Sequence, residues 1–256
     1  MRIVIKIGTS TLAYATGRLN IRRVEALCKT MSDIRNAGHE LILVSSGAIG
    51  MGVGKLGLRE RPQDIPGKQA AAAVGQCELM YIYDKLFSEY PHTVAQLLIT
   101  AENLTNETRH LNFTNTLTRL LELGVVPVIN ENDTVATEEI VIGDNDTLAA
   151  NVARSVGARL LILLSDIDGL YTADPHTNPD AALLPVVRRV DEEIKKLAGV
   201  SSTTQGTGGM VTKLRAAEIC LGCGCEMVIA NGNNPAALYD IVEGKPVGTR
   251  FVGEWV

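Results

Sequence analysis

Two lysines stand beside glycine-rich turns in this sequence. Lys6 interrupts an apolar run and lies two residues before Gly8. The second, Lys213, ends the segment Gly206-Thr-Gly-Gly-Met-Val-Thr-Lys213. Glycines let backbone amides approach a phosphate closely, and a following helix offers its N-terminal amides. Both lysines therefore fit an anion site, although a lysine on an edge strand and a flexible connector are ordinary structural alternatives.

A third polar group is Gly143-Asp-Asn-Asp146, which opens a stretch with helical spacing. Acidic residues at a helix start commonly serve only as caps, so this motif alone proves nothing. The four histidines are scattered, and none belongs to a nucleophile–base pair. Phosphoryl transfer needs little covalent help, but it does need cations over the transferring group. Two lysines with an aspartate that positions them would meet that need, and a carboxylate acceptor would require no general base.

The positions of apolar residues indicate strands that alternate with helices. Apolar runs predict strands at 3–7, 41–44, 94–99, 125–129, 160–164 and 227–230. Helical spacing appears at 24–34, 69–89, 113–121, 148–156, 191–197 and 213–221, while 135–142 alternates weakly and resembles a hairpin. Continuous apolar strands joined by helices predict a mostly parallel sheet that is covered on both faces.

In such a sheet, ligands bind beyond the carboxyl ends of the strands. Small and polar residues follow these predicted strand ends at 6–8, 46–47, 130–133, 165–166 and 231–232. We therefore expect the active site at this edge of the sheet.

Composition excludes several classes of protein. The chain has 256 residues, of which 46% are hydrophobic, 21% charged and only 4% aromatic, with a formal net charge of -5. It has no dense Lys/Arg run and little material for base stacking, so we expect no nucleic-acid partner. No segment has the ~20 apolar residues of a membrane span, and no signal-peptide pattern is present, so we expect a cytoplasmic protein without a membrane partner.

The five cysteines are expected to be free thiols, because their number is odd and no export signal is present. Cys220, Cys223 and Cys225 lie close together, but no second Cys pair or nearby His completes a four-ligand zinc site. The sequence predicts no metal ligand set, and the role of this cluster stays open.

Assembled in order, these motifs resemble the amino-acid kinase family over essentially the whole chain. Within that family they most resemble the branch that phosphorylates the side-chain carboxylate of glutamate. The motifs that carry the resemblance are Val4-Ile-Lys-Ile-Gly-Thr-Ser10, Val44-Ser-Ser-Gly-Ala-Ile49, Pro127-Val-Ile-Asn-Glu-Asn-Asp133, Gly143-Asp-Asn-Asp146, Gly169-Leu-Tyr-Thr-Ala-Asp-Pro175 and Gly206-Thr-Gly-Gly-Met-Val-Thr-Lys213.

The resemblance implies a role for each group of residues. Lys6 and Lys213 would stabilise the phosphoryl group in flight, and Asp146 would orient both lysines. Residues expected to hold L-glutamate are Ser46, Gly47, Asn130, Asp133 and Asn145. Residues expected to bind ATP are Lys6, Gly8, Thr9, Ser165, Asp166, Thr207, Gly208, Gly209, Met210, Val211, Thr212 and Lys213. Gly47 would also bring its amide to the phosphates, and Mg²⁺ would bridge those phosphates with few protein ligands.

The resemblance also implies a fold and partners. The fold is a three-layer αβα sandwich around a mostly parallel, roughly eight-stranded sheet. One kinase domain would fill residues 1–256, with a glutamate-binding N-terminal half and an ATP-binding C-terminal half. The expected activity opens proline biosynthesis, so L-proline would be a feedback inhibitor, and the protein would be a homo-oligomer. Many relatives carry a C-terminal PUA domain, which we expect this chain to lack because the sequence stops at Val256.

Two other functions stay open on sequence grounds. A UMP kinase would need basic residues for the acceptor phosphate, whereas Glu131, Asp133 and Glu138 make the presumed acceptor segment acidic. A non-catalytic sensor would be expected to lack Lys6, Asp146 or Lys213, and all three are present.

Overall fold

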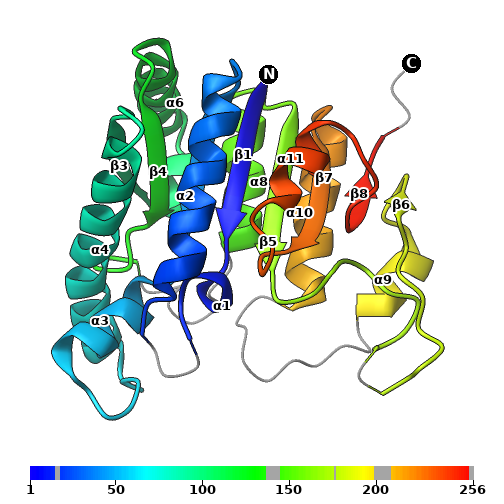
Figure 1. Ribbon diagram of the computed structural model, residues 1–256, viewed down its shortest axis with the longest axis horizontal. Coiled ribbons are helices and arrows are strands. Elements are labelled where there is room, and N and C mark those ends of the chain that lie inside the picture. The colour runs from blue at the N-terminus through cyan, green and yellow to red at the C-terminus, as the bar shows by residue number, and fades with distance from the viewer. Residues whose placement is uncertain (15–17, 137–144, 176, 199–208, 254–256) are drawn as a thin grey trace.

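A single sheet of eight strands runs through the described part of the chain, in the order β3-β4-β2-β1-β5-β7-β8-β6 (Figure 1). This computed structural model describes all residues except 15–17, 137–144, 176, 199–208 and 254–256. The strands are β1 (Arg2–Ile7), β2 (Glu40–Ser45), β3 (Val94–Ile99), β4 (Val126–Glu131), β5 (Leu160–Ser165), β6 (Val186–Val187), β7 (Glu226–Asn231) and β8 (Thr249–Phe251).

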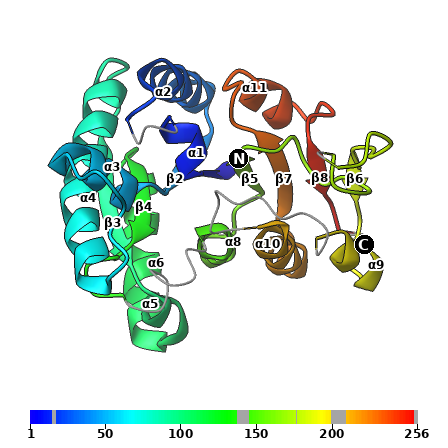
Figure 2. The same ribbon diagram turned by 90° about the horizontal axis from the view of Figure 1, so that it is seen from below.

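The sheet is mostly parallel. Among the described pairings only β7 with β8 is antiparallel. Strand β1 lies between β2 and β5, and the chain builds the sheet first on one side of β1 and then on the other. Such a reversal of strand order is where open α/β sheets place their ligands. Figure 2 looks onto the carboxyl edge of the central strands, where the parallel strands β1, β2, β4 and β5 end.

Helices cover both faces of the sheet. They are α1 (Thr9–Leu12), α2 (Ile21–Asn36), α3 (Ala48–Leu56), α4 (Ile65–Ser88), α5 (Ala101–Thr105), α6 (Glu107–Glu122), α8 (Asn145–Ser155), α9 (Glu192–Ala198), α10 (Met210–Gly222) and α11 (Ala237–Val242). One hydrophobic core joins the sheet to α2, α3, α4 and α11, and the other joins it to α6, α8 and α10 (Figure 2). The three-layer αβα sandwich implied by the family resemblance is confirmed.

Local sequence explains the ends of the major helices. The Asn20 side chain accepts a hydrogen bond from the Arg23 amide (3.2 Å) and caps α2. In the same way, Asp64 accepts from the Gly67 amide (2.9 Å), so α4 begins at Ile65 rather than at the expected residue 69. Apolar periodicity is weak at the start of this helix, which is why the pattern missed its first turn.

All six strands predicted from apolar runs are present. The two short strands β6 and β8 were not predicted from the pattern, because runs of two and three residues carry no measurable alternation. The expected hairpin at 135–142 lies mostly outside the described residues, and Val135 lies in a turn. All five cysteines are free thiols, as expected.

Helix α3 was also missed, and its glycines explain why. The segment Ala48–Leu56 contains three glycines, which lower helix propensity. Its partner α4 compensates by close backbone packing. A Cβ atom at Gly52 would lie 1.7 Å from the Ala71 carbonyl oxygen, and one at Gly75 would lie 1.8 Å from the Ala48 carbonyl oxygen. The glycines thus allow α3 to pack directly on α4, and this contact positions the Ser46–Gly47 turn at the N-terminus of α3.

Candidate active site

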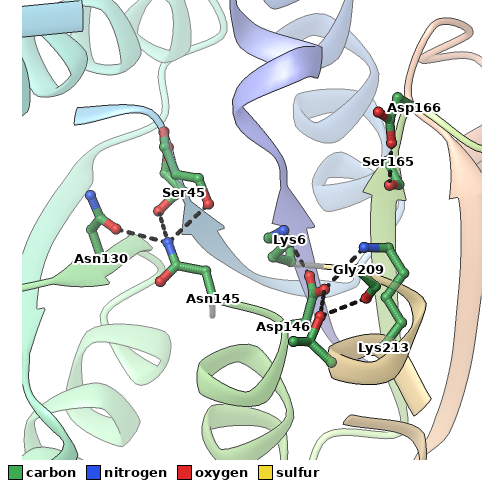
Figure 3. A network of polar contacts seen from close by, with 11 residues as sticks. Lys6, Ser45, Asn130, Asn145, Asp146, Ser165, Asp166, Gly209 and Lys213 are labelled. Carbon is green, nitrogen blue, oxygen red and sulfur yellow. Dashed lines mark hydrogen bonds and ion pairs between the residues drawn. The ribbon is translucent and has the colours of Figure 1, made fainter. Parts of the chain in front are cut away.

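The centre of the site is one buried aspartate that holds two lysines from different parts of the chain. Asp146 lies in the first turn of α8 and is 1% exposed. Lys6, from β1, places its Nζ atom 2.7 Å from Asp146 Oδ1, and Lys213, from α10, places its Nζ atom 3.1 Å from Oδ2 (Figure 3). Thr212 Oγ1 also donates to Oδ2 at 2.9 Å.

The electrostatics of this cluster favour an anionic ligand. Burial alone would raise the pKa of Asp146, but the Lys6 and Lys213 ammonium groups and their hydrogen bonds outweigh it and lower that pKa to about 2. The carboxylate is therefore ionised near neutral pH, and the three side chains together carry a net charge of +1. Both lysine side chains are largely buried. A buried excess of positive charge is costly unless an anion such as phosphate approaches it.

A network of neutral amides lies next to this charged cluster. Asn145 precedes Asp146, and its Nδ2 atom donates toward the Ser45 carbonyl oxygen (3.0 Å), Ser46 Oγ (2.9 Å) and Asn130 Oδ1 (3.1 Å) (Figure 3). Asn130 in turn donates from Nδ2 to Gln76 Oε1 on α4 (2.9 Å). The carboxyl ends of β2 and β4 are thereby tied to the start of α8.

A pocket lies on the other side of the cluster. Ser165, Asp166, Gly209, Met210 and Lys213, all predicted for ATP binding, line it together. Apolar side chains complete the lining, as expected where a base would bind: Ile167, Leu170 and Leu197. Ser165 Oγ donates to Asp166 Oδ1 at 3.0 Å, which fixes the turn after β5.

The glycine turns after β1 and β2 lie against each other. A Cβ atom at Gly47 would lie 3.7 Å from Thr9 Cγ2, so these two predicted phosphate-binding residues are neighbours. Gly47 adopts φ 95°, a left-handed conformation that favours glycine. The Gly8 amide, in contrast, donates to the Leu164 carbonyl oxygen (3.2 Å) and ties β1 to β5. In this structure the Gly8 amide is therefore engaged within the sheet rather than open to a ligand.

The remaining predicted residues differ in their placement. Asp133 lies half-buried in the turn after β4, at the same edge of the sheet. Val211 does not line the pocket formed by Ser165 and Lys213. It is 56% exposed and lines a separate hollow with Ala198 and Leu214. Thr207 and Gly208 lie outside the described residues.

Sequence reasoning missed Gln76 and Tyr83, two buried residues of α4. Tyr83 is fully enclosed, and its hydroxyl lies 2.9 Å from Ser45 Oγ, at the end of β2. Gln76 supports Asn130 directly. Both positions continue the buried face of α4 that includes Ala72 and Leu79, because 72, 76, 79 and 83 follow helical spacing. A glutamine on that face was the available signal, since buried amides need partners.

In the described chain, no helix combines the length and apolarity required to cross a lipid bilayer. Within the same residues, no group of three or more His, Cys, Asp or Glu side chains could hold a metal ion.

Solved structures share this architecture. The chain superposes on carbamate kinase from Giardia lamblia with a TM-score of 0.71 at 17% identity, covering 99% of this chain and 98% of that one. It superposes on UMP kinase from Ureaplasma parvum with a TM-score of 0.65 at 17% identity, covering 98% of each chain. These similarities establish the fold.

Sequence comparison gives the family. The model of the amino acid kinase family matches residues 1–231. The chain is 51% identical to glutamate 5-kinase from Clostridium perfringens, covering 99% of this chain and 96% of that protein. It is 52% identical to glutamate 5-kinase from Caldanaerobacter subterraneus, covering 98% of this chain and 68% of that longer protein. The chain therefore belongs to the amino acid kinase family and, within it, to the glutamate 5-kinases.

Proposed function

We propose that this chain transfers the γ-phosphoryl group of ATP to the side-chain carboxylate of L-glutamate, the first step of proline biosynthesis. A carboxylate oxygen attacks the γ-phosphorus, the bond to ADP breaks, and L-glutamyl 5-phosphate and ADP leave. The observation that carries this proposal is the buried Lys6–Asp146–Lys213 cluster with its net positive charge. It lies between a nucleotide pocket and an amide network.

Lys6 and Lys213 act on the phosphoryl group during transfer. Charge accumulates on its oxygens as the bond to ADP breaks, and two cations in a water-poor site stabilise that charge. Asp146 fixes both ammonium groups before the substrate arrives, so little reorganisation is needed. In this assignment Asp146 is a positioning residue and the two lysines are catalytic residues.

The amide network would hold glutamate. Ser46, Asn130 and Asn145 offer hydroxyl and amide groups, and Gly47 offers its backbone amide. Asp133, in the turn after β4, would meet the ammonium group of glutamate. This set supports an amino-acid acceptor because the groups it presents are neutral or acidic, whereas a phosphate acceptor would need cations.

MgATP would occupy the pocket beside β5 and α10. Thr9 would approach the phosphates from the other side, and Lys213 would contact them from α10. Mg²⁺ would neutralise charge on the β- and γ-phosphates. It would be held mainly by phosphate oxygens and water, because both Asp146 oxygens already contact lysines. This division makes the N-terminal half the glutamate side and the C-terminal half the ATP side of one kinase domain.

L-proline would inhibit by binding in the place of glutamate. It shares the α-carboxylate and a cationic nitrogen with glutamate, but it lacks the carboxylate that reacts. We expect the protein to form a homo-oligomer, and we expect residues 1–256 to be sufficient for this inhibition. Initial rates against glutamate at several fixed proline concentrations test this: inhibition should weaken as glutamate rises, and inhibition that glutamate cannot relieve rules out a shared site.

One assay tests the activity itself. ADP release is measured with L-glutamate, N-acetylglutamate, L-aspartate and UMP side by side, with hydroxylamine present to trap an acyl phosphate as a hydroxamate. Turnover and hydroxamate should appear with L-glutamate. Equal or faster turnover with UMP or N-acetylglutamate would overturn the assignment.

A further inference from the structure

Gln76 is a buried amide whose orientation follows from fixed backbone groups. The Glu131 amide donates to Asn130 Oδ1 at 2.9 Å, so this oxygen must be the acceptor. Asn130 Nδ2 is then a donor, and Gln76 has to accept with Oε1, at 2.9 Å. Flipping either side-chain amide would place two donors or two acceptors next to each other, so both orientations are fixed.

This orientation leaves the Gln76 Nε2 atom, with two N–H donors, facing away from Asn130. Within the described chain Nε2 has no hydrogen-bond partner. The fully buried polar atoms without a partner do not include Nε2, so this atom is accessible to solvent. Gln76 as a whole is nevertheless 8% exposed. Nε2 therefore reaches the protein surface from a mostly buried residue, as expected of a donor that is kept available for a ligand.

At the other end of the network, the side-chain oxygen of Asn145 is a hydrogen-bond acceptor without a described partner. Asn145 directs Nδ2 toward the Ser45 carbonyl oxygen, which can only accept. Its Oδ1 atom must therefore point elsewhere, and no partner for it is present among the described residues. The network thus begins with an available N–H donor at Gln76 and ends with an available carbonyl acceptor at Asn145. An α-amino acid presents the complementary pair, a carboxylate and an ammonium group.

We propose that Gln76 donates a hydrogen bond to the α-carboxylate of the amino-acid substrate and so discriminates a free α-carboxylate from an amide. This proposal rests on the function proposed above. The α-carboxylate is assigned because Gln76 joins the network through Asn130 on β4, two strands from the β1 strand that carries Lys6. That separation is about 10 Å, so Gln76 meets the end of the substrate opposite the phosphoryl group.

The test uses substrate pairs and two substitutions. Kinetics are measured with L-glutamate and with glutamate α-amide, in which a carboxamide replaces the α-carboxylate. Gln76→Glu keeps an oxygen acceptor for Asn130 Nδ2 but replaces the N–H donors with a negative oxygen. It should raise KM for L-glutamate by at least about 10-fold, the usual effect of losing a hydrogen bond to a charged group. The KM for ATP should stay unchanged.

The α-amide separates recognition from structural damage. With Gln76→Glu, the α-amide can donate to the new carboxylate, so the ratio of kcat/KM for L-glutamate to that for the α-amide should fall by about 10-fold or more. Gln76→Met removes the donors without adding charge and should lower the same ratio. The matched control is Gln96→Glu, at an exposed position on β3, which should leave both substrates unaffected.

Each outcome decides between the two proposals. If the unmodified chain does not turn over L-glutamate, the proposed function fails. If it does, and the Gln76 variants lose the same factor with both substrates or change neither, Gln76 is only a structural support and the inference fails. Should Gln76→Glu not fold, as judged by thermal melting, the ratio measured with Gln76→Met decides.

Discussion

The charged and the neutral parts of the site differ in how they are held, although they meet at adjacent residues. Asp146 belongs to a cluster of full charges with Lys6 and Lys213. Asn145 belongs to a chain of amides with Asn130 and Gln76. The first arrangement keeps two cations in place for charge that develops during transfer, whereas the second presents fixed donors and acceptors to a bound molecule. The difference predicts that damage to the cluster lowers kcat and damage to the network raises KM.

The largest effect is expected from the two lysines. Lys6→Ala and Lys213→Ala each remove a cation that matters most in the transition state, so kcat should fall by ~10²–10³ while KM for glutamate changes little. Steady-state kinetics measure this, and Lys29→Ala on the exposed face of α2 is the control. A Lys213→Ala protein with near-normal kcat would show that the glycine-rich segment is only a connector.

A second prediction concerns the packing of α3 on α4, which supports the neutral amide network of the site. Gly75→Ala inserts a methyl group 1.8 Å from the Ala48 carbonyl oxygen, so α3 must move away from α4. We expect a loss of about 3 kcal/mol in the free energy of unfolding, at the upper end of overpacking costs. The surviving folded protein should show a raised KM for glutamate, because α3 carries the Ser46–Gly47 turn.

The control for this substitution is Gly222→Ala in α10. No atom lies within 4 Å of a Cβ at that position, so the change should be nearly neutral. Urea unfolding of the two variants measures the difference. Equal stability of both would mean that α3 and α4 can separate at no cost, and the close contact would then not explain the glycines.

The sequence predicted the central strands and the edge of the sheet that carries the candidate site, because both depend on the local pattern of apolar and polar residues. The runs 3–7 and 160–164 are almost wholly apolar, and strands of that kind lie in the middle of parallel sheets. The polar residues after them had to meet at one edge. Helix α3 could not be predicted in the same way, because it is stabilised by backbone contact with α4, which begins nine residues after α3 ends.

The residues alone suggested an aspartate that positions two lysines, but the assignment of this role to Asp146 came from the family resemblance. Nothing in the local sequence links residues 6, 146 and 213, because their contact depends on the register of β1 and on the start positions of α8 and α10. Gln76 illustrates the opposite case. Its place on an apolar helix face was readable, but its partner Asn130 was not, since that contact crosses 54 residues.

The third prediction uses acid to weaken the charged cluster. The pKa of Asp146 falls from 3.8 to about 2 in the folded protein, despite the opposing effect of burial. A lowered pKa means that ionised Asp146 stabilises the fold above pH 4, and that this contribution disappears as the pH falls toward 2. Its size is about 2 kcal/mol. Urea unfolding at pH 7, 4, 3 and 2 measures it.

Asp146→Asn provides the comparison for this pH dependence. The variant cannot ionise at position 146, so its stability should depend less on pH between 4 and 2 than that of the unmodified protein. It should also be less stable at pH 7, because two buried lysines lose their counter-charge. Identical pH profiles for the two proteins would show that Asp146 is not held ionised by the lysines.

The smallest effect is expected at Thr212, which borders the cluster without carrying charge. Its Oγ1 atom lies 2.9 Å from Asp146 Oδ2 and 2.8 Å from the Gly209 carbonyl oxygen, so one hydroxyl proton serves two acceptors. Thr212→Val keeps the shape of the side chain and removes that proton. Both lysine contacts with Asp146 remain, so kcat should fall by only about 3- to 10-fold, the effect of one hydrogen bond.

Acid stability distinguishes this role from a simple contact with ATP. Because the Thr212 hydroxyl stabilises the ionised form of Asp146, Thr212→Val should raise the pKa of that carboxyl group and move the acid loss of stability to higher pH. Thr212→Ser keeps the hydroxyl and should restore both kcat and the acid profile. If Thr212→Val instead raises KM for ATP and leaves the acid profile unchanged, Thr212 binds the nucleotide and does not support Asp146.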